Sequence, residues 1–200
     1  MSYYPSLHHR RSIRLKGNYS QEGLYFITIC CRHWECLFGK IVDGEMILND
    51  AGKIAFNEWA KLPERFSNVE LDAFQIMPNH IHGIIVLNPT LAVSQNDKVS
   101  VPVGATLAVA QNHAQNNTNT RATARVAPTD IGIPGIIGAY KSLVANGCLK
   151  IYKSKNKKMS KLWQRNYYEH IIRNEQSLKL IIEYIVNNPN KWNEDKFYKE

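Results

Sequence analysis

Two histidines in an apolar segment are the sharpest chemical feature of this 200-residue chain. His80 and His82 flank Ile81 in the run HIHGIIVL, whose β-branched residues are typical of a buried strand. Because side chains alternate along a strand, we expect both imidazoles on the same face, side by side. Such a pair can chelate one divalent cation, and a cation gives partners to nitrogens that are costly to bury alone. The pattern is short, so a pair of core or surface histidines without a metal is the alternative interpretation.

A phenol and an amide share one edge of the last predicted helix, which begins near Asn174 and is ended by Pro189. At about 100° per residue, Tyr184 and Asn188 fall within roughly 40° of each other. They lie beside an apolar stripe formed by Leu178, Ile181, Ile182 and Ile185. Packing of that stripe on a sheet would carry both polar groups towards the histidine pair. Taken alone, Tyr184 also fits a core aromatic whose hydroxyl bonds a polar neighbour.

The elements that must position these groups are strands mixed with helices. Residues 23–31, 69–77 and 80–87 have strand character, and Asp43-Gly44 predicts a hairpin turn within 39–48. A helix is predicted from an N-cap at Asn49 or Asp50 as far as Phe66, and another around 136–144 with Gly147 as its stop. The mixture indicates an α+β fold, with an antiparallel sheet and helices packed on one face.

The composition changes abruptly between Pro89 and Asp130, where Asn, Gln, Ala, Thr and Val dominate. The segment TLAVSQN at 90–96 returns as TLAVAQN at 106–112, sixteen residues later. A repeat this short cannot bury a core by stacking, so we interpret it as a duplicated segment within a loop. The chain is therefore predicted to form a single domain, 1–200, interrupted by a low-complexity insert at about 89–130.

The charge balance favours a polyanionic partner. Twenty-five Lys and Arg against 17 Asp and Glu give a formal net charge of +8. No apolar run is long enough to span a membrane, and the N-terminal residues lack the apolar core of a signal peptide, so we expect a cytoplasmic protein without membrane contact.

Two basic arms are candidates for contacts with DNA phosphates, although such runs are often only solvated surface. The candidates are Arg10, Arg11, Arg14 and Lys16 near the start, with Lys153, Lys155, Lys157, Lys158 and Arg165 later, in a stretch that also holds Lys150 and Lys161. Tyr152 and Trp163 are candidates for stacking on unpaired bases.

The segment Met77-Pro78-Asn79-His80-Ile81-His82-Gly83-Ile84 resembles the His-hydrophobic-His motif of the HUH endonuclease superfamily, in its single-tyrosine transposase branch. The run WQRNYYEHIIR at 163–173, followed by Glu183-Tyr184-Ile185 and Asn188-Pro189, is similar to REP-associated tyrosine transposases. The resemblance covers nearly the whole chain outside the insert.

This resemblance implies a ferredoxin-like or RRM-like HUH domain. It implies that His80 and His82 ligate Mg²⁺ or Mn²⁺, that Tyr184 is the nucleophile, and that Asn188 is a third ligand or an orienting group. Tyr167 and Tyr168 are rival nucleophiles, but only Tyr184 has a polar partner four residues on. The implied partner is single-stranded DNA that forms a hairpin, and a homodimer stays open.

Three functions remain in competition at this point. The leading hypothesis is a single-strand DNA transposase that cleaves and rejoins DNA through a 5′-phosphotyrosine. The second is a non-catalytic single-stranded nucleic-acid-binding protein of the same fold. The third is a metal-dependent phosphoesterase that uses a bound water, with Tyr184 merely packed.

Overall fold

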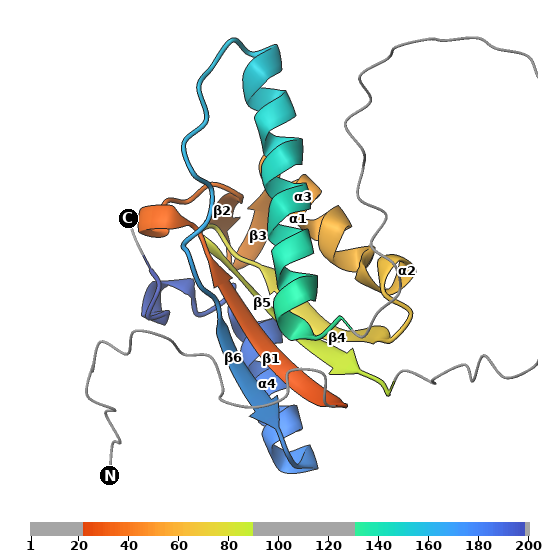
Figure 1. Cartoon of the computed structure of the whole chain (residues 1–200). Coiled ribbons are helices and arrows are strands. Elements are labelled where there is room, and N and C mark those ends of the chain that lie inside the picture. The colour runs from red at the N-terminus through yellow and green to blue at the C-terminus, as the bar shows by residue number, and fades with distance from the viewer. Residues whose placement is uncertain (1–21, 90–130, 199–200) are drawn as a thin grey trace, which may run out of the picture.

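The computed structural model describes residues 22–89 and 131–198 (Figure 1). The predicted insert falls almost entirely outside these residues, as do the predicted DNA contacts Arg10, Arg11, Arg14 and Lys16. None of the helices in the described ranges is long and apolar enough to cross a membrane.

A four-stranded antiparallel sheet, ordered β4-β5-β1-β6, is the frame of the fold. Its strands are β1 (Gly23–Cys30), β4 (Val69–Ile76), β5 (His80–Leu87) and β6 (Tyr168–Ile172). The predicted α+β class with an antiparallel sheet is confirmed. The edge strand β6 was not anticipated, although Tyr168, Ile171 and Ile172 are residues that favour strands.

A separate hairpin follows β1 and leads into the first helix. β2 (Gly39–Val42) and β3 (Glu45–Leu48) pair as the Asp43-Gly44 turn predicted, and both turn residues have positive φ. The Asn49 side chain then caps α1 (Asp50–Ala60) by accepting a hydrogen bond from the Gly52 N–H at 2.9 Å.

The helix predicted to reach Phe66 is two helices instead of one. α1 ends at Ala60, and α2 (Leu62–Arg65) follows after Lys61. Pro63 lies in the first turn of α2, where its missing N–H is tolerated; within a continuous helix its ring would clash with the carbonyl four residues earlier. The proline therefore explains why an apolar period that continues to Phe66 does not produce one long helix.

Helices cover both faces of the sheet. The larger core lies between one face of the sheet and the helices α1 and α3 (Ile133–Ser154). It includes Tyr25, Ile27 and Ile29 of β1. On the other face, Leu24 and Phe26 belong to a smaller cluster with the apolar stripe of α4 (Glu175–Asn187). Figure 1 shows α3 in front of the strands and α4 behind them. α4 thus departs from the predicted one-sided arrangement, because both sets of alternating side chains on β1 are apolar.

Two glycines permit the close packing of α1 against its neighbours. A Cβ on Gly83 would lie 2.4 Å from the Trp59 ring, so β5 can support that buried indole only with glycine here. A Cβ on Gly147 would lie 2.8 Å from Ile54. The prediction that Gly147 ends its helix is wrong, because α3 continues past it and uses the missing side chain to approach α1.

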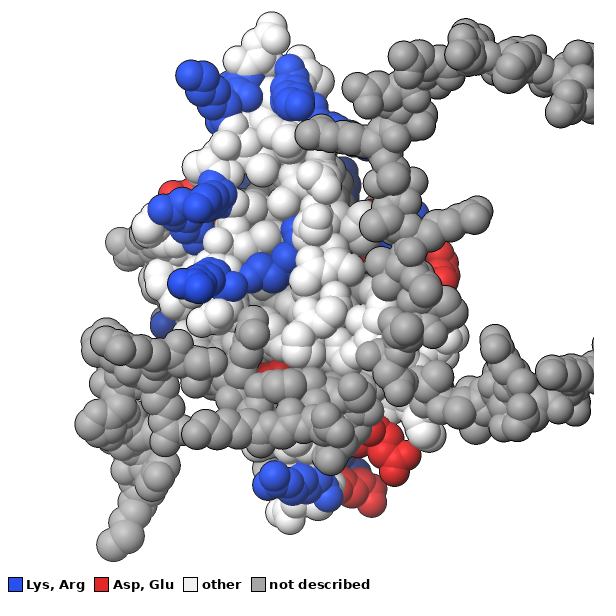
Figure 2. All heavy atoms as spheres, in the orientation of Figure 1, with Lys and Arg blue, Asp and Glu red and all other residues white. Residues whose placement is uncertain are grey.

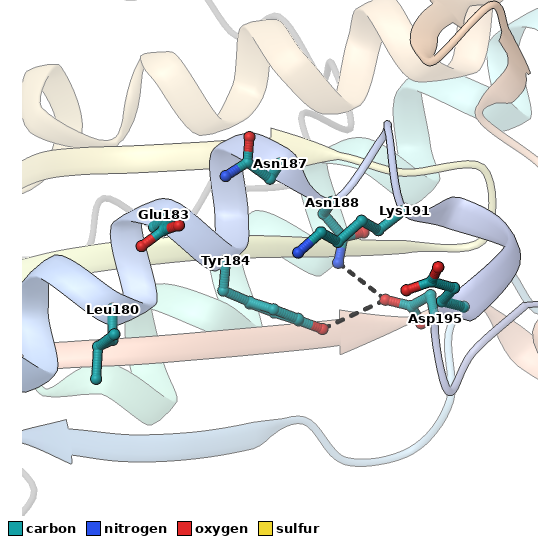
Figure 3. A pocket seen from close by; sticks show the side chains of 8 residues that line it. Leu180, Glu183, Tyr184, Asn187, Asn188, Lys191 and Asp195 are labelled. Atoms are coloured by element: carbon teal, nitrogen blue, oxygen red, sulfur yellow. Dashed lines mark hydrogen bonds between the residues drawn. The ribbon is translucent and has the colours of Figure 1, made fainter.

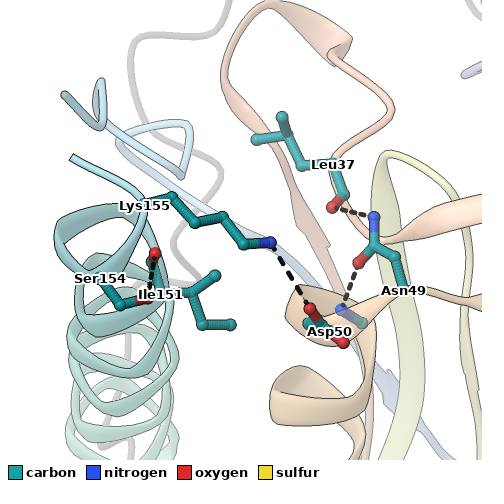
Figure 4. A network of polar contacts seen from close by, with 7 residues as sticks. Leu37, Asn49, Asp50, Ile151, Ser154 and Lys155 are labelled. Atoms are coloured by element: carbon teal, nitrogen blue, oxygen red, sulfur yellow. Dashed lines mark hydrogen bonds and ion pairs between the residues drawn. The ribbon is translucent and has the colours of Figure 1, made fainter. Parts of the chain in front are cut away.

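Polar contacts join the far end of α3 to the start of α1 (Figure 4). Lys155, which caps α3, lies 3.7 Å from the Asp50 carboxylate, and the Asn49 amide donates to the Leu37 carbonyl. The ion pair is exposed, so it contributes little to stability. Two short 3₁₀ turns, η1 (Arg32–Trp34) and η2 (Trp192–Glu194), complete the described elements.

Candidate active site

The histidine pair sits at the start of β5, on the face that α4 covers. His80 and His82 are fully buried, with ring centroids 4.4 Å apart. The register of the sheet places His82 opposite Thr28 and His80 opposite Cys30. The predicted placement of both imidazoles on one face of an interior strand therefore agrees with the geometry, whereas their function as ligands stays a prediction.

The protonation of His80 follows from the side chain of Asn79. The Asn79 amide nitrogen donates to the backbone carbonyls of Phe197 at 2.7 Å and Trp34 at 3.2 Å. Both carbonyls can only accept, so the amide oxygen must face His80 Nδ1, 2.8 Å away. His80 therefore carries its proton on Nδ1 and presents an unprotonated Nε2, which is buried and has no hydrogen-bond partner among the described residues.

His82 is held by a hydroxyl at each ring nitrogen. Thr28 Oγ1 lies 2.8 Å from Nδ1, and the Tyr184 hydroxyl lies 3.1 Å from Nε2. Hydroxyls can donate or accept, so these two partners fit either tautomer of the ring. The Phe26 ring, 5.4 Å away by centroid, stacks on one face of the imidazole and fixes its plane.

Both imidazoles are neutral at pH 7. Burial lowers the pKa of His80 to about 4, with the Asp195 carboxylate acting in the opposite direction. Burial also lowers the pKa of His82 well below its usual range, and the neighbouring His80 and Lys196 lower it further. Neutral imidazole is the form that ligates a metal, so no proton has to be displaced before binding.

An acidic residue that sequence reasoning missed completes the cluster. Potential ligand atoms of His80, His82 and Asp195 all lie within 4.8 Å of one another, so this group could hold a metal ion. Asp195 follows η2, outside any periodic element. The unpaired Nε2 of His80 and a donor set of two imidazoles and a carboxylate fit a divalent cation such as Mn²⁺.

Tyr184 reaches this cluster from α4, as the helical period predicted. Its hydroxyl lies 3.3 Å from Asp195 Oδ2, in addition to the His82 contact, while the side chain stays 41% exposed. Burial raises the pKa of the phenol above its usual value, and the Asp195 carboxylate raises it further. The phenol is therefore protonated at neutral pH and needs a proton acceptor before it can attack.

Asn188 lies beside the cluster, and its side chain contacts the Asp195 carboxylate. Its amide nitrogen donates to Asp195 Oδ2 at 2.9 Å, and its amide oxygen is buried without a hydrogen-bond partner in the described part of the chain. Figure 3 shows Tyr184 and Asn188 converging on Asp195. The three residues line a cleft of about 340 Å³. The hydrogen bond from Asn188 holds the Asp195 carboxylate in place. Both predicted roles of Asn188, as a metal ligand or as an orienting group, stay predictions.

Many of the described basic side chains gather on one part of the surface. Figure 2 shows Lys and Arg side chains gathered over the C-terminal end of α3 and down one side of the molecule. The side chains of Lys153, Lys155, Lys157, Lys158 and Arg165 are exposed, as contacts to phosphates require.

Trp163, a predicted stacking residue, is partly packed into the main core. Its indole N–H donates to the Lys141 carbonyl at 2.9 Å, and its ring packs on Phe38 at a centroid distance of 5.4 Å. The side chain is half-buried against the main core. An isolated bridge with Cys31 also ties Trp163 to the end of β1, and its predicted stacking on a base stays a prediction.

Comparison with curated proteins finds one clear relative. An uncharacterized protein of Haemophilus influenzae is 41% identical over 197 residues, which is 98% of this chain and 97% of the other. The chain belongs to the family of that protein. No protein-family model matches the sequence.

Solved structures with a similar fold include two that are described as transposases or candidates for that activity. One is a REP-associated tyrosine transposase bound to a REP hairpin, at 18% identity and a TM-score of 0.49, covering 96% of this chain and 74% of that one. The other is a candidate transposase from Deinococcus radiodurans, at 15% identity and a TM-score of 0.41, covering 87% and 97%.

Proposed function

We propose that this protein is a metal-dependent tyrosine endonuclease and strand transferase that cleaves and rejoins single-stranded DNA. One observation carries the proposal: the Tyr184 hydroxyl lies 3.1 Å from His82, within a cluster of His80, His82 and Asp195 that could hold a cation. The proposed nucleophile thus lies beside the proposed ligands, and Tyr184 and Asp195 line the same cleft, where attack on a phosphodiester could take place. The motif resemblance to single-tyrosine transposases supports the same assignment.

His80, His82 and Asp195 would hold the cation, which would neutralise charge on the non-bridging oxygens of the phosphate. Thr28 and Asn79 fix the two imidazoles. Asn188 holds Asp195 Oδ2, the atom that also accepts the phenolic hydrogen bond. These contacts position every side chain before DNA arrives, which lowers the cost of orienting them during reaction.

The covalent step forms one bond and breaks one. The Tyr184 oxygen bonds to phosphorus, and the bond from phosphorus to the 3′ oxygen breaks. The phenolic proton passes to Asp195, its hydrogen-bond acceptor, while the leaving oxygen takes a proton from solvent to give a free 3′-OH. The 5′-phosphotyrosine keeps the energy of the phosphodiester, so the strand can be rejoined without ATP.

The test is a covalent adduct. Protein incubated with labelled single-stranded hairpin DNA and Mn²⁺ should yield a denaturation-resistant complex, which Tyr184→Phe should reduce by roughly 10³-fold or more. Tyr168→Phe is the matched control, since Tyr168 is a half-exposed phenol within the same motif. Cleavage that survives Tyr184→Phe would establish the water mechanism, and binding without cleavage by the unmutated protein would establish the non-catalytic alternative.

A further inference from the structure

A second pocket adjoins the metal cluster and has an aromatic wall. It has a volume of about 240 Å³ and is lined by His33, Trp34, Lys196, Phe197 and Tyr198. The rings of Trp34 and Phe197 are stacked, with centroids 4.7 Å apart and planes 15° from parallel. Tyr198 is 39% exposed, so it offers a ring to solvent. Stacked and exposed rings of this kind are what single-stranded nucleic-acid sites use to hold a base without reading its sequence.

The same pocket carries positive charge. The Lys196 ammonium lies 4.6 Å from the centroid of the Phe197 ring and belongs to an exposed residue. Among the residues in 22–89 and 131–198, no carboxylate forms an ion pair with it. A cation held over an aromatic wall suits a ligand that has both a flat ring and a phosphate.

The pocket and the metal cluster share a wall. The Phe197 ring contacts the His80 ring at a centroid distance of 4.8 Å and the His82 ring at 6.1 Å. The Asn79 amide, which orients His80, also donates to the backbone carbonyls of Trp34 and Phe197. One buried side chain therefore fixes the ligand and both walls of the pocket relative to each other.

The backbone of one wall is held in an unfavourable conformation. His33 and Trp34 have φ values of 55° and 59°, the left-handed region that residues other than glycine rarely occupy. Consecutive residues of this kind persist only where the surroundings fix them, and they gather at ligand sites. Here the Asn79 hydrogen bond to the Trp34 carbonyl provides part of that fixation.

From this geometry we propose that the pocket binds one nucleotide of a single-stranded DNA, with the base packed against both Trp34 and Tyr198 and a phosphate at Lys196. The inference rests on the proposed function and deepens it: this nucleotide would neighbour the phosphate that Tyr184 attacks. Stacking on one face of the base serves any sequence, so the subsite would position the strand without selecting it.

The test separates binding from cleavage by using the Tyr184→Phe background with Mn²⁺. The probe is a random-sequence single-stranded 20-mer that carries 5-iodo-2′-deoxyuridine and a fluorescent end label. Illumination should crosslink the probe to Trp34 or Tyr198, as identified by mass spectrometry. In anisotropy titrations, Trp34→Leu and Tyr198→Ala should each weaken binding by about 5- to 150-fold, the range expected for loss of one stacked base. Lys196→Ala should reduce the salt dependence of binding.

Matched variants on α1, across the sheet, should leave binding unchanged: Phe56→Leu for an exposed ring and Lys53→Ala for an exposed cation. Because Tyr198 is exposed, Tyr198→Ala carries the test even if Trp34→Leu does not fold. Unchanged affinity in Tyr198→Ala and Lys196→Ala, with crosslinks elsewhere, would overturn the subsite. That result is distinct from failure of the proposed function, which is the absence of a Tyr184 adduct in the unmutated protein.

Discussion

The side-chain oxygen of Asn79 accepts a hydrogen bond from Nδ1 of His80 at 2.8 Å, and thereby leaves Nε2 of that ring with a bare lone pair. The orientation of the amide is fixed, because its nitrogen donates hydrogen bonds to two backbone carbonyls. One buried amide thus decides which nitrogen of His80 is available to a cation.

Asn79→Ala should weaken binding of Mn²⁺ by about 10- to 100-fold, the usual loss when the partner of a ligating histidine is removed. Calorimetric titration of the purified protein measures this. Asn88→Ala is the control, since Asn88 is a side chain of the same type at the opposite end of β5. Equal Mn²⁺ affinity in Asn79→Ala and the unmutated protein would show that Asn79 does not prepare His80 for binding a cation.

Asp195→Asn should reduce Mn²⁺ affinity by at least about tenfold, because a charged ligand is replaced by a neutral one. It should also lower the rate of adduct formation through loss of the group that accepts the Tyr184 proton. Glu194→Gln is the neighbouring control: it removes one charge from the same cleft but lies outside the group of potential ligands. If Asp195→Asn and Glu194→Gln bind Mn²⁺ equally, Asp195 contributes only its negative charge and is not a ligand.

The metal-free protein should lose stability as the pH falls from about 6.5 towards about 4. The pKa of His80 is lowered to about 4 in the folded state, and that of His82 is also lowered, while unfolded histidine titrates near 6.5. Below pH 6.5 the histidines of the unfolded chain therefore bind more protons than those of the folded chain, and the free energy of unfolding falls. Above pH 6.5 this contribution to stability is fully present.

Urea titrations at pH 7.5 and pH 5 in the presence of a chelator measure the effect. The double variant His80→Gln and His82→Gln should show a smaller difference in the free energy of unfolding between the two pH values. An undiminished difference would assign the acid sensitivity to other groups.

Gly83→Ala should destabilise the protein by about 1–3 kcal/mol, as overpacking of a core does. The added Cβ would lie 2.4 Å from the Trp59 ring and 3.1 Å from the Phe74 side chain. Gly138→Ala is the opposite case, because no atom of the described residues beyond the neighbouring backbone of α3 lies within 4 Å of its Cβ position. Alanine there should stabilise the helix by up to about 1 kcal/mol. Thermal unfolding of both variants checks the pair, and a loss of stability in both would contradict the packing argument.

Local periodicity was enough to bring three groups of the site together. The alternation of a strand places His80 and His82 on one face, and the period of a helix places Tyr184 beside its apolar stripe; both rules depend only on neighbours in the sequence. Asp195 follows neither rule. It enters the cluster because the chain turns back after α4, which is a tertiary event with no periodic signal.

The faces of the sheet were harder to assign for a related reason. β1 has apolar side chains on both faces, so its sequence allows a helix on either side, and only the packed structure shows that α4 takes the face with the histidines. The continuation of α3 past Gly147 also depends on a partner, since Ile54 of another helix fills the space that the glycine leaves.

The direction of β5 places its two histidines and the exposed Pro89, which follows the strand, at opposite ends of the sheet. His80 begins the strand and Leu87 ends it, so about seven steps of roughly 3.3 Å lie between the imidazoles and the exit towards Pro89. A substitution or a small label at Pro89, which is exposed, would therefore leave the two imidazoles at their present spacing.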